Sequence, residues 1–218
     1  MMLLRKYLLG CCLLIGFALT FSMLVWSDPQ RHVAQKSADI RFVSPDGAFA
    51  FTYPRTLIKC EKDPKQESSW IPARSCGGYI PVCADASLDE DATVACIAYP
   101  AETLNGTNFQ AAAFTVSQLH TATSDECLQV VEPHPATSHK ETINGVTFDV
   151  FDAGGVGAGN ALAADAYRSF HQNRCYELDL RVAFSNISNF DPGTVKEFDG
   201  KPVNRVLQSV LNSFKFLK

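Results

Sequence analysis

Six cysteines are the residues whose type and number point most clearly to a chemistry. Two further cysteines lie in an apolar stretch at positions 11 and 12, which leaves an even set: Cys60, Cys76, Cys83, Cys96, Cys127 and Cys175. An even number of cysteines in an exported chain predicts a disulfide framework, here of up to three bonds. Six cysteines can pair in fifteen ways. Proximity favours only Cys76 with Cys83, which flank a Gly-Gly pair and a proline.

A metal site is the alternative use of these cysteines. The sequence contains no Cys-x-x-Cys, and His120, His134 and His139 show no ligand spacing. We therefore expect disulfides, with no metal and no cofactor.

Few residues are arranged for catalysis. The sequence contains no Gly-x-Ser-x-Gly, no His-Glu-x-x-His and no cysteine beside a histidine as an activated thiol. His171 could approach Glu177 or Asp179 across a hairpin, but polar side chains on a solvated sheet face explain these residues more simply. We expect a protein that is not an enzyme.

Residues 153–160, Ala-Gly-Gly-Val-Gly-Ala-Gly-Asn, are the one segment that suggests a cofactor loop. They follow an expected strand, yet no register gives Gly-x-Gly-x-x-Gly, and no Gly-Lys-Ser/Thr follows. A flexible hairpin loop is the simpler interpretation. Gly155 and Gly157 then become candidate contacts for a partner.

Residues 60–88 are a second candidate recognition segment. They hold three prolines, two glycines and three cysteines with almost no periodicity. So long an irregular segment is uncommon in a compact domain and is usually functional or covalently pinned. We expect disulfides to pin it. If it binds a partner, its apolar contacts are Trp70, Ile71, Tyr79 and Ile80.

The N-terminal 27 residues predict export. Arg5 and Lys6 precede residues 7–26, which carry no charge and are long enough to span a bilayer. The same stretch fits a signal peptide cleaved before Asp28, so a cleaved leader and an uncleaved anchor both remain open. Either way the rest of the chain is extracytoplasmic. It is secreted or periplasmic after cleavage, and otherwise held at the membrane through residues 7–26.

Length and composition support one sizeable domain. The chain has 218 residues, of which 46% are hydrophobic, and we place the domain at residues 40–218 after a spacer over residues 28–39. The net charge is −4 and no Lys/Arg-rich run occurs. Both features argue against a nucleic-acid partner.

An antiparallel sheet is the predicted core. Residues 175–184 alternate in a way that is typical of a strand with one buried and one solvated face. The expected buried face holds Tyr176, Leu178, Leu180, Val182 and Phe184, and the expected solvated face holds Cys175, Glu177, Asp179, Arg181 and Ala183. Further strands are expected at residues 40–43, 48–53, 94–99, 109–119, 146–150 and 164–171, of which residues 167–171 would pair with residues 175–184.

Turn and cap signals separate these strands. Asp-Gly at 46–47 and Asn-Gly at 144–145 predict tight hairpins. Thr123 followed by Glu126 has the spacing of a capping box and predicts a short helix over residues 124–131. Pro202 and an apolar period of three to four residues predict a C-terminal helix, and Phe214 and Phe216 begin a last short strand.

Two of these segments resemble the opening and closing segments of PsbP-like domains, the photosystem extrinsic-subunit type and its exported bacterial relatives. The segments are Phe-Ala-Phe-Thr-Tyr-Pro at 49–54 and Val-Leu-Gln-Ser-Val-Leu-Asn-Ser-Phe-Lys-Phe at 206–216. The resemblance implies an α+β fold over residues 40–218, an α/β/α sandwich around an antiparallel sheet. It also implies binding or accessory function, since members of this fold mostly act in that way.

The expected function is therefore a non-enzymatic binding or accessory module of the cell envelope or extracellular space. Its partner would be a protein or a small apolar ligand. The contact surfaces would be the segment from Trp70 to Tyr79 and the glycine-rich loop, because loops on a rigid scaffold carry recognition. The alternative is an extracytoplasmic hydrolase with a site near the glycine-rich loop.

Overall fold

The computed structural model describes residues 39–217 except residue 78 and residues 84–91, 120–122 and 130–138. The leader expected over residues 1–27, and all of the expected spacer but its last residue, lie outside the described residues. Among the residues that are described, no helix is both long and apolar enough to cross a membrane. They all belong to one contact unit, Ser37–Lys218.

The fold is built around two long antiparallel strands, β11 (Asn160–His171) and β12 (Arg174–Ser185). Gln172 and Asn173 form their turn, and both have the positive φ angles that a tight two-residue hairpin needs. Along its other edge, β12 pairs with β7 (Phe109–Leu119). The strand predicted at 175–184 is therefore a central strand, paired along both edges.

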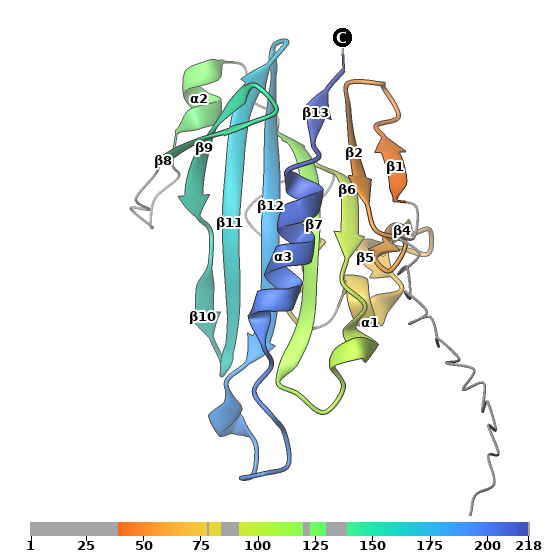
Figure 1. Ribbon diagram of the computed structural model, residues 1–218, viewed down its shortest axis with the longest axis vertical. Coiled ribbons are helices and arrows are strands. Elements are labelled where there is room, and N and C mark those ends of the chain that lie inside the picture. Colours follow the sequence, from red (N-terminus) through yellow and green to blue (C-terminus); the bar gives the residue numbers. More distant parts are fainter. Residues whose placement is uncertain (1–38, 78, 84–91, 120–122, 130–138, 218) are drawn as a thin grey trace, which may run out of the picture. The chain divides into compact units, whose positions relative to one another are not determined.

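The other strands extend the main sheet in the order β3-β6-β7-β12-β11-β9-β8, with β10 paired to β11 (Figure 1). Their bounds are β3 Ile58–Lys59, β6 Thr93–Ala98, β8 His139–Ile143, β9 Val146–Asp152 and β10 Gly155–Gly157. Asn144 and Gly145 turn β8 into β9 with positive φ angles, which confirms the predicted hairpin. The strands predicted at 94–99 and 109–119 correspond to β6 and β7.

The first face of the main sheet, which carries Tyr176 and Leu178, is covered by α3 (Gly200–Leu211) and a three-stranded sheet. In Figure 1, α3 runs along β12 and β7. The carboxylate of Asp199 caps α3 by accepting a hydrogen bond from the Lys201 N–H. The buried residues of α3 recur every three or four positions, as predicted: Val203, Leu207, Val210 and Leu211.

The three-stranded sheet has the order β1-β2-β13, with bounds β1 Ile40–Val43, β2 Phe49–Tyr53 and β13 Lys215–Phe216. Its aromatic residues close the core against the main sheet. Phe51 meets Phe114 of β7 edge to face with ring centroids 5.1 Å apart, and Phe49 meets Tyr176 of β12 at 6.1 Å. Such edge-to-face pairs add to the stabilisation from buried area.

The second face of the main sheet, which carries Glu177, Asp179 and Arg181, is buried. The sequence predicted a solvated face here, and that prediction was wrong, because these residues are only 1%, 1% and 4% exposed. Glu177 pairs with Arg168 of β11, and the Thr115 hydroxyl donates to Asp179 at 3.0 Å. Charged side chains are rarely buried without such partners. The alternation therefore identified which positions are polar, but it did not show which of them contact solvent.

Disulfide-linked elements cover this second face. At one end lie the hairpin of β4 (Glu61–Asp63) and β5 (Gln66–Ile71) and the helix α1 (Ala73–Cys76). Their cluster packs on small residues of the sheet: Ala98, Ala111, Ala113 and Ala183. At the other end, α2 (Ser124–Leu128) brings Cys127 to Cys175 of β12.

The three disulfides are Cys60–Cys76, Cys83–Cys96 and Cys127–Cys175. Three bonds were predicted, but the expected pair Cys76–Cys83 was wrong. After β5, α1 returns Cys76 to within 5.8 Å of Cys60, Cα to Cα. Cys83 instead lies beside β6, 5.5 Å from Cys96, so the three bonds join the six cysteines in chain order, first to second, third to fourth and fifth to sixth.

The fold is consequently mainly antiparallel β, and the expected α/β/α sandwich is not clearly formed. Of the described elements on the second face, the helices are short and the rest is a β-hairpin, so no helical layer forms there. The irregular segment expected at 60–88 contains β4, β5 and α1. The helix expected at 124–131 ends at Leu128, although Thr123 and Glu126 form the predicted capping box. Two single-turn 3-10 helices, Ala101–Leu104 and Ile187–Asn189, complete the described elements.

Candidate functional site

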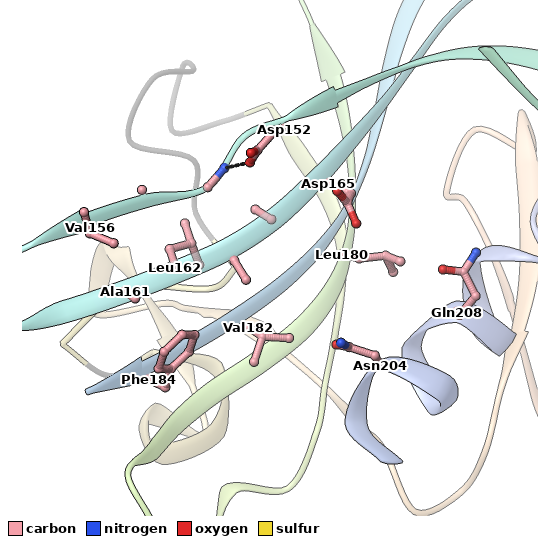
Figure 2. Close-up of a pocket in the computed structure, with 14 residues that line it drawn as sticks. Asp152, Val156, Ala161, Leu162, Asp165, Leu180, Val182, Phe184, Asn204 and Gln208 are labelled. Carbon is pink, nitrogen blue, oxygen red and sulfur yellow. Dashed lines mark hydrogen bonds between the residues drawn. The ribbon is translucent and has the colours of Figure 1, made fainter. Parts of the chain in front are cut away.

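A groove of about 720 Å³ opens on the first face, beside α3. Figure 2 shows β9 and β10 on one side of it, α3 on the other, and β11 and β12 as its floor. The groove exists because α3 lies over β12 and β7, whereas the β10–β11 hairpin extends the sheet beyond the helix.

The edge of the groove depends on one close backbone approach. At Gly154, a Cβ atom would lie 2.7 Å from the carbonyl oxygen of Leu162, so only glycine fits where β9 bends into β10. By contrast, a Cβ at Gly155 or Gly157 would meet nothing within 4 Å. The close approach at Gly154 thus explains part of the glycine-rich segment. Farther along the segment, Val156 is 89% exposed.

The floor of the groove is apolar. Leu180, Val182 and Phe184 project from β12, and Ala161 and Ala163 project from β11 directly opposite Phe184 and Val182. The alanines leave space that larger side chains would fill. A mostly apolar floor with a few polar groups at the edge is typical of small-molecule sites.

Of the residues that the structure describes in the lining of the groove, only two aspartates are charged. Asp152 and Asp165 are paired directly across β9 and β11, a position in which like charges disfavour each other. Partial burial, and secondarily the charge of Asp152, raise the pKa of the Asp165 carboxyl, while His139 opposes this shift. The Gly154 N–H donates to Asp152 Oδ1 at 2.9 Å, which fixes that carboxylate at the rim.

Polar residues of α3 form the opposite wall. Asn204 and Gln208 lie one turn apart and point toward the strands in Figure 2. Next to the groove, burial raises the pKa of Tyr167 to about 12, with smaller contributions from the charges of Glu141 and Asp165, while a hydrogen bond with Gln208 acts in the other direction. Tyr167 is therefore a neutral phenol throughout the physiological pH range.

The structure distributes the predicted contact residues over two regions. Gly155 lines the groove, and Gly157 lies at the exposed tip of the same hairpin. Trp70 is only 7% exposed and packs in the cluster formed with the cysteines, and Ile80 is partly buried against that cluster. Tyr79 and Ile71 are exposed, Tyr79 by 75%. The segment from Trp70 to Tyr79 is not part of the groove.

His171 does not meet Glu177 or Asp179. His171 lies on the first face, where its ring stacks on Phe216 with centroids 4.0 Å apart. Glu177 and Asp179 lie on the second face, with Arg168 and Thr115. The register places them on opposite sides of the sheet, so they form no acid–base pair.

Among the described residues, one group of side chains is close enough together to hold a metal ion: the sulfur atoms of Cys60, Cys83 and Cys96. All three are engaged in disulfides here. The groove contains no such group within the described ranges.

Sequence reasoning found the glycine-rich edge of the groove and missed its polar residues. Asp165 lies in the alanine-rich first half of β11, within the strand predicted at 164–171, but no local motif in the sequence marked it as part of a site. The alternation of Ala161, Ala163, Asp165 and Tyr167 on one face was the available signal. Asn204 and Gln208 fall between the apolar positions of the C-terminal helix, and their polarity alone did not mark them as part of a site.

Comparison with known proteins gives matches in structure only. No protein-family model matches the sequence, and no curated protein matches it either. A crystal structure from Bacteroides thetaiotaomicron is similar with a TM-score of 0.45 and 12% identity, over 82% of this chain and 48% of that one. This chain thus spans about half the length of that protein. The solution structure of cyanobacterial PsbP from Synechocystis is similar with a TM-score of 0.39 and 9% identity, over 83% of this chain and 94% of that one. A PsbP protein is therefore among its structural neighbours, as the two terminal segments predicted.

Proposed function

We propose that this protein is an extracytoplasmic, non-enzymatic binding module that holds a small ligand in the groove between α3 and the β9–β11 strands. Three disulfides support the compartment, since such bonds form and persist in oxidising environments. The volume and apolar floor of the groove support a ligand of small-molecule size.

The charge of the groove suggests the ligand's chemistry. Its two charged lining residues, Asp152 and Asp165, are both acidic, and the apolar floor lies beside them. A ligand with an apolar body and one cationic group would cover the floor and relieve the repulsion between the paired carboxylates. This pairing of an apolar floor with two aspartates is the observation that carries the proposal.

The test compares two amphiphiles of equal chain length below their micellar concentrations. Octyltrimethylammonium is expected to bind the full chain in calorimetric titration, and octyl sulfate is not. Changing both Asp152 and Asp165 to Asn should weaken the binding of octyltrimethylammonium by roughly 2- to 30-fold, since exposed ion pairs contribute about 0.2–1 kcal/mol each. Asp191→Asn, an exposed aspartate outside the groove, is the matched control. Equal binding of both amphiphiles, or no effect of the double variant, would contradict the proposal.

The hydrolase alternative now has a specific location. The Asp152–Asp165 pair, in which one carboxyl has a raised pKa, would have to supply the general acid and base. Turnover in a panel of esters, phosphoesters and glycosides that disappears in Asp165→Asn would favour it over binding alone. If turnover persists in Asp165→Asn, the active site does not depend on the Asp152–Asp165 pair.

A further inference from the structure

Two of the three disulfides lie side by side. Cys60 follows β3 and continues its pairing with β6, because its N–H donates to the Cys96 carbonyl at 2.9 Å. Cys60 and Cys96 are therefore direct cross-strand neighbours, yet each is bonded to a different partner, Cys76 and Cys83. The sulfur atoms of Cys60, Cys83 and Cys96 all lie within 4.8 Å of one another, and the Cys76 sulfur is 2.06 Å from that of Cys60.

This four-cysteine cluster is enclosed. Cys76, Cys83 and Cys96 are fully buried, and Cys60 is 4% exposed. Apolar residues of β5, β6 and β7 surround the cluster, among them Trp70 and Ala98. A closed set of four protein ligands without an open position is typical of a structural zinc site.

We propose that the reduced form of this cluster binds one Zn²⁺ through Cys60, Cys76, Cys83 and Cys96. A tetrahedral site with Zn–S bonds of about 2.3 Å places its sulfurs about 3.8 Å apart. Three sulfurs already lie within 4.8 Å of one another. The fourth, on Cys76, lies outside that group and is bonded to Cys60 in this structure, so its side chain has to turn toward Cys83 and Cys96 once the bond opens.

The exchange between the disulfide form and the zinc-bound form changes the oxidation state of sulfur only, and zinc remains Zn²⁺ throughout. A phosphine reductant supplies two electrons to each disulfide, and water supplies the protons, giving four thiols and two equivalents of phosphine oxide. Zinc binding then releases the thiol protons, because thiolate is the ligand. Conversely, two equivalents of a small disulfide oxidise the four thiolates, form both protein disulfides, release four small thiolates and expel the ion.

The consequence is that the packing of β5 and α1 against β6, one corner of the fold, can be stabilised either by disulfides or by zinc. Disulfides or a structural metal can each stabilise a segment whose own core is small. Here both would hold β5 and α1 against β6. Zinc would stabilise this corner before oxidation, and the disulfides would stabilise it afterwards.

The test uses the full chain with Cys11→Ser and Cys12→Ser, so that the N-terminal thiols do not contribute. The chain is reduced with a phosphine, refolded and titrated with Co²⁺, whose thiolate charge-transfer absorption reports sulfur ligation, and then with Zn²⁺ in competition. We expect one ion per chain and displacement of Co²⁺ by Zn²⁺. In this background, Cys60→Ser should lower affinity by more than about 100-fold, because even outer-shell partners of a metal contribute 10- to 100-fold.

The matched control changes Cys127 and Cys175 to Ser, which removes two thiols outside the cluster. Their bond is open in every reduced sample, so the control should bind Co²⁺ as the parent does. Circular dichroism of each sample reports whether the metal also restores strand structure. Absence of cobalt–thiolate absorption would overturn the proposal, as would binding that survives Cys60→Ser or equals that of the chain in urea.

Discussion

Removing the Cys127–Cys175 bond should destabilise the protein more than removing either other disulfide. This bond closes a segment of 48 residues, whereas Cys60–Cys76 and Cys83–Cys96 close 16 and 13. In the chain-entropy model, a bond stabilises the fold by restricting the unfolded chain, and the effect grows with the logarithm of loop length. For these loops it gives about 4.1, 3.1 and 2.9 kcal/mol at 25 °C.

The difference between two variants is more informative than either value. Changing both Cys127 and Cys175 to Ala should cost about 1.2 kcal/mol more than changing both Cys83 and Cys96 to Ala. Each double variant removes two fully buried sulfurs, so the losses of packing are matched. What differs between them is the length of the loop.

Guanidinium unfolding of the full chain provides the measurement. Tryptophan fluorescence, to which Trp70 contributes from its buried position next to the cysteine cluster, and far-ultraviolet circular dichroism should give coincident transitions if unfolding is two-state. Equal costs for the two double variants, or a larger cost for the Cys83–Cys96 variant, would refute the loop-length reasoning. Native contacts around each bond would then dominate.

Three further predictions concern single residues. Trp70→Ala should cost about 3–5 kcal/mol in urea unfolding because its side chain is buried, while the exposed Tyr79→Ala should stay within about 0.5 kcal/mol; similar costs would contradict the assignment of Trp70 to the core. Because the pKa of Tyr167 is raised from 10.0 to about 12 in the folded chain, its contribution to stability is complete below pH 10 and is lost as the pH rises toward 12. Tyr167→Phe should therefore show a smaller fall in unfolding free energy over that pH window. Parallel profiles of unfolding free energy against pH for the wild type and the variant would contradict this prediction. Thr123→Ala should cost about 1 kcal/mol through loss of the cap and speed amide exchange in α2, whereas unchanged exchange would mean that the Cys127–Cys175 bond alone holds this helix.

The sequence predicted local structure well and solvent exposure poorly. Alternation identified β12, and the Asn-Gly and Asp-Gly pairs located hairpins, because these signals are encoded within a few residues. Whether Glu177 meets water depends instead on segments that pack on the second face from far along the chain. The disulfide pairing failed for the same reason: the partner of Cys83 is set by β6, not by its distance from Cys76 in sequence.

The groove was predictable only in part, for a related physical reason. Gly154 belongs to a segment whose composition marks it as unusual, and the local bend needs that composition. Asp152 and Asp165 become a pair only through the register of β9 against β11. Asn204 and Gln208 become a wall only because α3 lies beside uncovered strands. A polar residue on a helix gives no signal of whether it faces solvent or a groove.

The empty space of the groove is a consequence of small side chains, and this makes the proposed ligand site testable without touching its charges. Ala163 projects from β11 opposite Val182 and lines the groove while remaining exposed. Ala163→Phe should fill the floor and abolish octyltrimethylammonium binding, with little effect on stability because no buried contact is lost. Ala153→Phe, exposed and nearby but outside the lining, is the matched control and should bind normally. If Ala163→Phe binds the cation as the wild type does, the aspartates attract it at the surface alone, and the apolar floor has no part in recognition.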